Sequence, residues 1–381
     1  MHINRDCLRI GIYGSYGGYN LGDEAILQSI IADVRANVRA ELTVFTRDPE
    51  DTLRRHRVEH AIPSWQMSRE EVRHEVERLD FLILGGGGIL YDADARNYLR
   101  EPTIALEKNI PVMVYAISAG PLNNHAVRRE VLHFLERVTA VTVRDRTALR
   151  LLEELGLQRE VVLTADPAFR NHYPITQIEN QDSGQRQPSR RRIGMSVREP
   201  GPAAPDINEH SYQQMLADSA DFIVERFGAE VVFVPMERKM KDLQQSHAVI
   251  SRMLRAEYAT VLQDEVTPDQ LIRIICQLDF CIGMRLHFLL FSALCGVPFV
   301  GLPYSPKVLA FLEDIGMTEP PINMVNAGRL IAHIDYAWDN RGQVVRYIQQ
   351  HIPALRERAS KNIQIALSVL HDRYGTIPKP Q

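Results

Sequence analysis

Hydrophobic residues follow two patterns that alternate along this chain. Short continuous apolar runs are typical of buried strands, whereas apolar residues every three or four positions indicate one face of a helix. A helix with this spacing starts at about Asp23. Strands that alternate with helices predict a largely parallel sheet covered on both faces. In the first half of the chain we predict strands at 8–13, 42–46, 81–84, 112–117 and 141–143.

The alternation stops after position 169 and restarts at 193. The stretch between is mostly polar with little to bury, which predicts a linker or an exposed loop. Two similar α/β halves facing a cleft are the simplest architecture. We therefore predict an N-terminal Rossmann-like domain over 1–175, a linker over 176–192, a C-terminal Rossmann-like domain over 193–340 and a helical tail over 341–381. In the second half we predict strands at 193–197, 231–234, 280–282 and 299–300, and helices at 212–226, 243–257 and 268–277.

Composition favours a soluble, cytoplasmic protein. The length of 381 residues suits two domains, and the net charge of −4 argues against a dedicated nucleic-acid binder. The four cysteines form no Cys-x-x-Cys pair, so we expect buried, unpaired thiols and a reducing compartment. The start of the chain does not resemble a secretory signal, and the apolar run at 288–302 is shorter than a membrane span. We expect any membrane contact to be peripheral.

The strongest candidate site lies where Arg285 and His287 follow the strand at 280–282 and precede an apolar helix. Ligands of wound α/β domains bind at the carboxyl ends of strands, where free helix N–H groups attract anions. Arginine can bind phosphate or carboxylate through two parallel bonds, and histidine can transfer protons near neutral pH. A lone histidine is more often a core residue, but the adjoining arginine favours a functional pair.

A glycine-rich segment after the first strand is the second candidate. It lacks the Lys-Ser/Thr ending of a P-loop and does not fit Gly-x-Gly-x-x-Gly, so nucleotide phosphate binding is not supported. Asp23 and Glu24 in the first helical turn oppose an incoming phosphate. Together with Gly18, Tyr19 and Asn20 they suit sugar hydroxyls better. The alternative is an ordinary strand-to-helix turn with an acidic cap.

Further candidates follow other predicted strands. The run Gly85–Gly88 can expose backbone N–H groups of Gly86 and Gly87 to a ligand, although close backbone packing explains it equally well. Arg144 and Arg198 each end a strand, and Lys307 precedes a helix. Together with the arginine of the first candidate they are suited to surround one small polyanion. A structural pair between Arg144 and the following aspartate, and a solvated lysine, are the alternatives.

The order of these segments resembles the polysaccharide pyruvyl transferase family, which includes bacterial enzymes that pyruvylate cell-wall and exopolysaccharide sugars. The resemblance runs from position 11 to about 317. Where the subfamily acting on lipid-linked wall-polymer precursors often has Asp before Pro-Lys, this chain has Ser305. The matching segments are 14–24, 84–88, 143–145, 165–167, 196–198, 283–287 and 296–298.

The resemblance implies a GT-B-like fold and transfer of pyruvate from phosphoenolpyruvate to two sugar hydroxyls as a ketal. It places the donor against the second half and the saccharide acceptor, lipid-linked or free, against the first. No metal or resident cofactor is implied. A nucleotide-sugar glycosyltransferase and a non-catalytic sugar- or phosphate-binding relative are the alternatives. The acceptor sugar, the ketal stereochemistry and the oligomeric state stay open.

The chemistry assigns roles to the candidate residues. Phosphoenolpyruvate carries a phosphate and a carboxylate, which Arg285 and Arg198 would hold, with Arg144 contributing from the other domain. Ketal formation needs a proton donor near the methylene carbon and a base near the sugar hydroxyl. His287 suits either role, and we assign it the role of the proton donor. Asn20, Asp23 and Glu24 would orient the sugar, either acid serving as the base.

Overall fold

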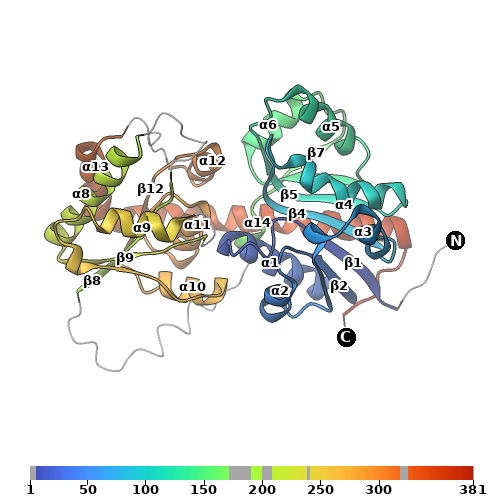
Figure 1. The fold of residues 1–381 in the computed structure, drawn as a ribbon, viewed down its shortest axis with the longest axis horizontal. Helices are drawn as coiled ribbons and strands as arrows, with labels where there is room; N and C mark the ends of the chain where they lie inside the picture. Colours follow the sequence, from blue (N-terminus) through green and yellow to red (C-terminus); the bar gives the residue numbers. More distant parts are fainter. Residues whose placement is uncertain (1–5, 171–189, 200–207, 238–240, 318–324, 381) are drawn as a thin grey trace. The chain divides into compact units, whose positions relative to one another are not determined.

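The computed structural model describes residues 6–170, 190–199, 208–237, 241–317 and 325–380 (Figure 1). These residues form two compact units. Unit 1 contains the described residues of Met1–Gly18, Asp23–Asn171 and Ala354–Gln381, and unit 2 those of Tyr19–Gly22 and His172–Pro353. Most of the predicted linker lies outside the described residues. The last two predicted linker positions open the first strand of unit 2.

Unit 1 is built on a seven-stranded parallel sheet with the order β3-β2-β1-β4-β5-β6-β7. Helices cover the sheet, as expected for strands whose side chains are buried on both faces. The strands are β1 (Leu8–Tyr13), β2 (Ala40–Phe45), β3 (His60–Ile62), β4 (Phe81–Leu90), β5 (Val112–Ala119), β6 (Ala140–Val143) and β7 (Val161–Leu163). The helices are α1 (Leu21–Asn37), α2 (Pro49–His56), α3 (Arg69–Val76), α4 (Ala95–Glu107), α5 (His125–Leu135) and α6 (Arg146–Glu154), with the short 3-10 turns η1 (Ser64–Gln66) and η2 (Pro167–Arg170).

Strand β4 extends beyond its predicted end. The four glycines of Gly85–Gly88 lie inside the strand, paired with β5 through Gly85 and Tyr115, and through Gly88 and Ser118. Gly86 and Gly87 have positive φ values of 66° and 89°, which glycine tolerates at little cost. The strand therefore continues through a local irregularity instead of ending in a loop.

The C-terminal helix α14 (Arg341–Tyr374) belongs to both units, because unit 1 begins again at Ala354. Its Ile363 and Leu370 are buried in the same core as Leu8 and Ile10 of β1. The buried Asn362 accepts hydrogen bonds from the hydroxyls of two threonines on unit 1. The second half of the predicted tail is thus a packed part of unit 1.

Unit 2 has a five-stranded parallel sheet with the order β10-β9-β8-β11-β12. Helix α11 is buried along nearly its whole length, which matches its continuous apolar sequence. The strands are β8 (Arg191–Ser196), β9 (Ala229–Phe233), β10 (Ala259–Val261), β11 (Phe280–Gly283) and β12 (Phe299–Gly301). The helices are α8 (Glu209–Phe227), α9 (Asp242–Ile250), α10 (Pro268–Ile275), α11 (Leu286–Cys295), α12 (Pro306–Asp314) and α13 (Ala327–Asp339), with the 3-10 turn η5 (Ala256–Tyr258).

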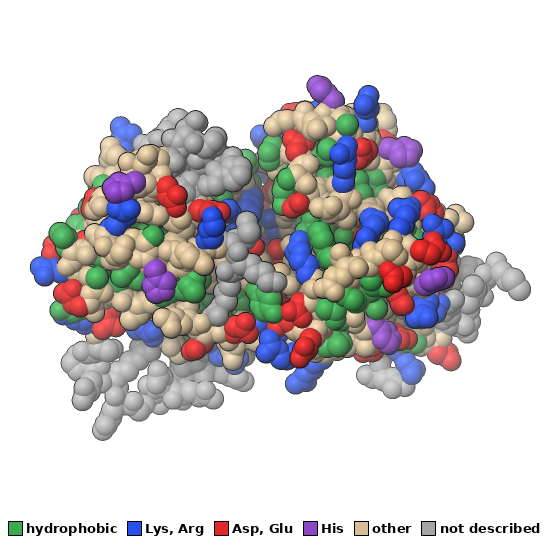
Figure 2. Space-filling model, viewed as in Figure 1, with side chains coloured by type: hydrophobic (Ala, Val, Ile, Leu, Met, Phe, Trp, Pro, Cys, Tyr) green, Lys and Arg blue, Asp and Glu red, His purple; other side chains and the backbone are tan. Residues whose placement is uncertain are grey.

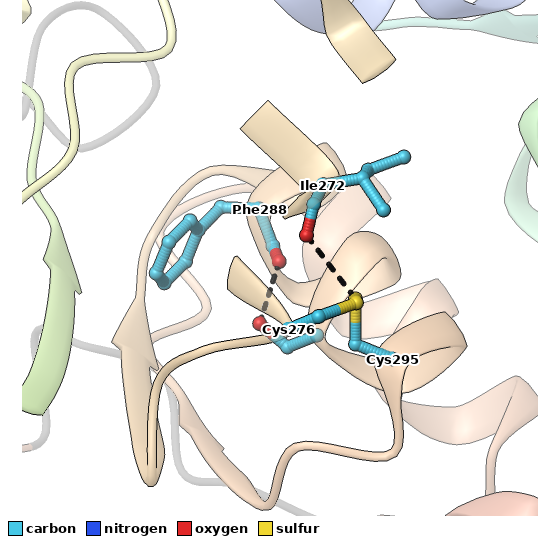
Figure 3. Close-up of a disulfide and its surroundings, with 5 residues drawn as sticks. Ile272, Cys276, Phe288 and Cys295 are labelled. Carbon is cyan, nitrogen blue, oxygen red and sulfur yellow. Dashed lines mark hydrogen bonds between the residues drawn. A yellow bond between two sulfur atoms is a disulfide. The ribbon is translucent and has the colours of Figure 1, made fainter. Parts of the chain in front are cut away.

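One prediction about the cysteines is wrong. Cys276, at the end of α10, forms a disulfide with Cys295, the last residue of α11 (Figure 3). Their Cα atoms are 5.1 Å apart. The pair escaped the sequence reasoning because both cysteines lie in apolar segments without a recognisable spacing. Cys7 and Cys281 are free thiols.

No helix within the described ranges is long and apolar enough to cross a membrane.

Candidate functional site

The predicted key arginine, Arg285, is buried at the N-terminal end of α11 in unit 2. Its guanidinium donates two parallel hydrogen bonds to Asp242, from Nε at 2.9 Å and from Nη2 at 2.6 Å, and its Nη1 lies 3.0 Å from Glu237. Burial opposes the charged form, but Asp242 outweighs this effect and raises the pKa of Arg285. Arg285 is therefore a neutralised, fixed cation. Another anion would have to compete with Glu237 for it.

Tyr304, in the segment between β12 and α12, is the centre of a positive cluster. Its hydroxyl accepts a hydrogen bond from Arg198 Nη1 at 3.0 Å, and the guanidinium carbon lies 4.7 Å from the ring centroid. Burial of Tyr304 disfavours the phenolate. The charges of Lys307, Arg198 and Arg285 overcome that effect and lower the pKa of Tyr304 to about 8. Three predicted donor residues therefore act on one buried phenol.

Arg198 and Lys307 differ from Arg285 in their charge balance. Within the described ranges no carboxylate forms an ion pair with either of them. Arg198 Nε donates a hydrogen bond to the backbone carbonyl of Glu199, which carries no formal charge. Two uncompensated cations beside a buried phenol favour the binding of a small anion.

His287, on the first turn of α11, packs against the glycine-rich segment. A Cβ atom on Gly22 would lie 2.0 Å from His287 Nδ1, so only glycine fits at that position. The imidazole also contacts Phe291, with ring centroids 6.1 Å apart. The predicted acid and the end of the predicted sugar-binding segment are therefore neighbours within unit 2.

The segment Tyr19–Gly22 packs as part of unit 2. The Asn20 side chain donates a 3.4 Å hydrogen bond to Glu237, and the backbone N–H of Leu21 donates to the carbonyl of Met236 at 3.0 Å. Glu237 consequently contacts both Asn20 and Arg285. One carboxylate connects the predicted sugar-binding segment with the predicted donor arginine.

The two acidic residues at the start of α1 have different surroundings in unit 1. Glu24 is buried, and its carboxylate lies 2.6 Å from His56 Nε2 and accepts the N–H of Gly17 at 2.9 Å. Asp23 is half-buried, and a Cβ atom on Gly87 would lie 3.2 Å from its Oδ1. This geometry gives Glu24 a structural role in holding the glycine-rich turn. Of the two acids, Asp23 is the more exposed.

Arg144 is also buried in unit 1, where its Nη1 lies 2.6 Å from Asp166 and its Nε 4.0 Å from Asp145. The structural pair raised as an alternative is thus present, with Asp166 as the closer partner. Asp145 caps α6 by accepting the N–H of Ala148 at 2.8 Å. These contacts account for both residues without a ligand.

Sequence reasoning did not find Asp242, Glu237 or Tyr304 as members of this site. Asp242 starts α9 and has no motif around it, so only the fold brings it to Arg285. Tyr304 lies within a segment that the sequence singled out for Lys307, and the Tyr-x-Pro-Lys spacing was the available signal.

Figure 2 shows acidic and basic side chains interspersed on the displayed face of each unit. In the part of the chain that the structure describes, no group of three or more His, Cys, Asp or Glu residues has a geometry that could hold a metal ion.

Comparison with known proteins identifies the family. The sequence model of the family described as polysaccharide pyruvyl transferase matches residues 20–306. The chain belongs to this family. It is also 22% identical over 298 residues to the amylovoran biosynthesis protein AmsJ of Erwinia amylovora, an alignment that covers 74% of this chain and 72% of AmsJ. A general role in polysaccharide biosynthesis follows.

Solved structures confirm the fold class. The UDP complex of S. aureus MnaA aligns over 98% of this chain and 100% of its own, with a TM-score of 0.66 and 10% identity. Anabaena Alr3699/HepE in complex with UDP and glucose aligns over 96% and 100%, with a TM-score of 0.62 and 12% identity. The putative UDP-N-acetylglucosamine 2-epimerase of Listeria monocytogenes aligns over 98% of both chains, with a TM-score of 0.63 and 12% identity. The predicted α/β, GT-B-like class is therefore correct.

Proposed function

We propose that this protein transfers the pyruvyl group of phosphoenolpyruvate to two hydroxyls of a saccharide acceptor, forming a ketal and releasing phosphate. Family membership supports a pyruvyl transferase. The observation that carries the choice of donor is the arrangement of Arg198 and Lys307 on Tyr304, since two cations without carboxylate partners in the described ranges suit a small, highly charged anion.

In the proposed reaction a proton adds to the methylene carbon of the donor, and its central carbon becomes electrophilic. One sugar hydroxyl attacks that carbon and loses its proton, the carbon–oxygen bond to phosphate breaks, and the second hydroxyl then attacks and loses its proton. One of these two protons replaces the one consumed, and the other leaves with the phosphate. The reaction thus needs an acid, a base and strong anion binding.

The contacts refine the roles of the candidate residues. Arg198 and Lys307 are assigned to the donor anion, and Arg285 to holding Glu237 and the segment at Asn20 in place. His287 is the proposed acid and Asp23 the proposed base. We assign structural roles to Glu24 and Arg144 because both are buried and already paired. Donor contact by Gly86 and Gly87 stays a prediction.

The test is turnover with a panel of saccharides. Phosphoenolpyruvate and each saccharide are incubated with the enzyme, and released phosphate and the mass of the product are measured. A pyruvate ketal from the wild type, at least a hundredfold slower from His287→Gln and unchanged from His247→Gln, supports the proposal; His247 is exposed on α9. Full turnover by His287→Gln would remove the acid assignment.

One observation favours a second candidate function. MnaA and Alr3699/HepE, which share the fold, are both described in complex with UDP. A nucleotide-sugar-dependent transferase would bind UDP-sugars, and it would produce no phosphate from phosphoenolpyruvate. The same panel with UDP-sugars as donors separates the two functions.

A further inference from the structure

Unit 1 contains an arginine that the proposed chemistry does not use. Arg47 follows β2 at its carboxyl end, beside the turn that follows β1. Its Nη1 donates to the Ser15 hydroxyl at 3.1 Å and its Nη2 to the Tyr98 hydroxyl at 2.9 Å. The guanidinium carbon lies 4.3 Å from the ring centroid of Trp65. Arg47 is therefore held in one orientation, although it is only half-buried.

The neighbours of Arg47 fix this arrangement. Trp65 and Tyr98 pack edge to face, with ring centroids 5.5 Å apart. A Cβ atom on Gly18 would lie 3.1 Å from Arg47 Nη1, so the glycine leaves space at the guanidinium. A stacked, hydrogen-bonded guanidinium loses little conformational freedom when it binds a ligand, which favours tight recognition.

Arg47 differs in its charge balance from other arginines of unit 1. Other partly buried arginines of unit 1 contact a carboxylate, for example Arg100 with Glu101 at 2.6 Å and Arg170 with Asp33 at 2.8 Å. Among the described residues none forms such a pair with Arg47. Within the described residues its guanidinium forms two hydrogen bonds, both to neutral hydroxyls, which leaves three of its five N–H donors available. A fixed cation with spare donors at the carboxyl edge of a parallel sheet suits an anion.

A carboxylate acts on the same tyrosine. Burial raises the pKa of Tyr98; the positive charge of Arg47 opposes this effect, and the negative charge of Asp23 adds to it. Asp23 and Arg47 are thus both within electrostatic range of the Tyr98 hydroxyl. A ligand with a phosphate on Arg47 and a hydroxyl near Asp23 would contact both groups.

We propose that Arg47, Trp65 and Tyr98 form an anion subsite in unit 1 that binds a phosphate group attached to the saccharide, so that the acceptor is a glycosyl phosphate or diphosphate. The assignment to the acceptor rests on the proposed function, whereas the subsite itself does not. A neutral sugar would leave the guanidinium without its counter-charge.

The chain offers a direct reporter, because its two tryptophans lie in different units. In a Trp338→Phe background, fluorescence comes from Trp65 alone. We expect inorganic pyrophosphate and glucose 1-phosphate to change it saturably, and methyl glucoside to have no effect. Arg47→Gln should weaken the binding of both phosphate compounds at least tenfold. Arg47→Lys, which keeps the charge but loses the planar guanidinium, should weaken their binding less. Arg150→Gln, an exposed arginine of α6, is the matched control.

Several results would overturn the subsite. One is Trp65 fluorescence that does not change when pyrophosphate is added. Another is an affinity of Arg47→Gln for pyrophosphate equal to that of Arg150→Gln. The third is a fluorescence response to pyrophosphate that is lost in Arg198→Gln and kept in Arg47→Gln. Unfolding of Arg47→Gln and Arg47→Lys by urea identifies a folding defect in either variant. Calorimetry of phosphoenolpyruvate binding to the wild type tests the proposed donor independently of the subsite. If the wild type does not bind phosphoenolpyruvate, this contradicts the proposed function but does not affect the pyrophosphate result.

Discussion

The buried pair of Arg285 and Asp242 allows a quantitative prediction. Asp242 is fully buried, and its carboxylate accepts two bonds from the guanidinium and the backbone N–H groups of Met236 and Glu237, at 3.2 and 3.1 Å. Asp242→Asn removes the negative charge and leaves the cation buried. Breaking a buried ion pair in this way costs about 3–5 kcal/mol.

Glu237 moderates that loss, because it stays 3.0 Å from Arg285 Nη1. We therefore expect Asp242→Asn to lower the free energy of unfolding by about 3 kcal/mol, the lower end of the range. Glu237→Gln should cost only about 1 kcal/mol, since its side chain is 19% exposed and can be partly solvated. Asp264→Asn, an exposed acid of unit 2, should cost less than about 0.5 kcal/mol.

The assay is urea unfolding followed by tryptophan fluorescence. Trp65→Phe is used as the background, so that the signal comes from Trp338, which stacks on Phe227 in unit 2 with ring centroids 4.4 Å apart. Equal costs for Asp242→Asn and Glu237→Gln, or a cost below about 1 kcal/mol for the former, would refute the reasoning that Asp242 is the main partner of Arg285.

Three further predictions use other parts of unit 2. Wild-type protein should show one tyrosinate absorbance step at about pH 8 that Tyr304→Phe lacks. Because this pKa lies below the ordinary value of 10, ionised Tyr304 adds stability as the pH rises from about 8 to 10, and the gain is lost as the pH falls through 8. Gly22→Ala should reduce turnover at least tenfold, because the methyl group of alanine would displace His287. Its effect on the free energy of unfolding should be smaller than its effect on turnover. Reduction of the Cys276–Cys295 disulfide, which closes a loop of sequence separation 19, should lower the free energy of unfolding by about 3 kcal/mol, measured with and without dithiothreitol.

Each of these has its own contradicting result. If the absorbance step at pH 8 persists in Tyr304→Phe, it comes from another tyrosine. Wild-type turnover by Gly22→Ala would show that the imidazole position is not critical. Equal sensitivity to dithiothreitol in the wild type and in a variant with serine at both Cys276 and Cys295 would show that the disulfide is not the cause.

Most of the fold was predictable because its central strands are continuous apolar runs. The four edge strands β3, β7, β10 and β12 have only three residues each, and only β12 was predicted. The four glycines were placed beyond the end of the predicted strand because glycine is weak in strands, yet pairing with β5 includes them in β4. Tertiary contacts decided these cases against local preference.

Candidate residues could be found in the sequence where charged or polar groups follow a predicted strand. Arg285 and His287 lie on one turn and were found together. Asp242 and Arg47 come from segments without a motif, and their importance depends on contacts that the sequence does not display. A charged residue at a strand end can also form an ion pair within the fold, as Arg144 does with Asp166.

Calorimetric titration with phosphoenolpyruvate tests the proposed donor most directly. The wild type and Arg273→Gln, an exposed control on α10, should bind phosphoenolpyruvate equally. Arg198→Gln should bind it at least tenfold more weakly, since it loses a charge-assisted contact worth about 1.5–3 kcal/mol. Binding of UDP-N-acetylglucosamine by the wild type, with no heat from phosphoenolpyruvate, would contradict the account.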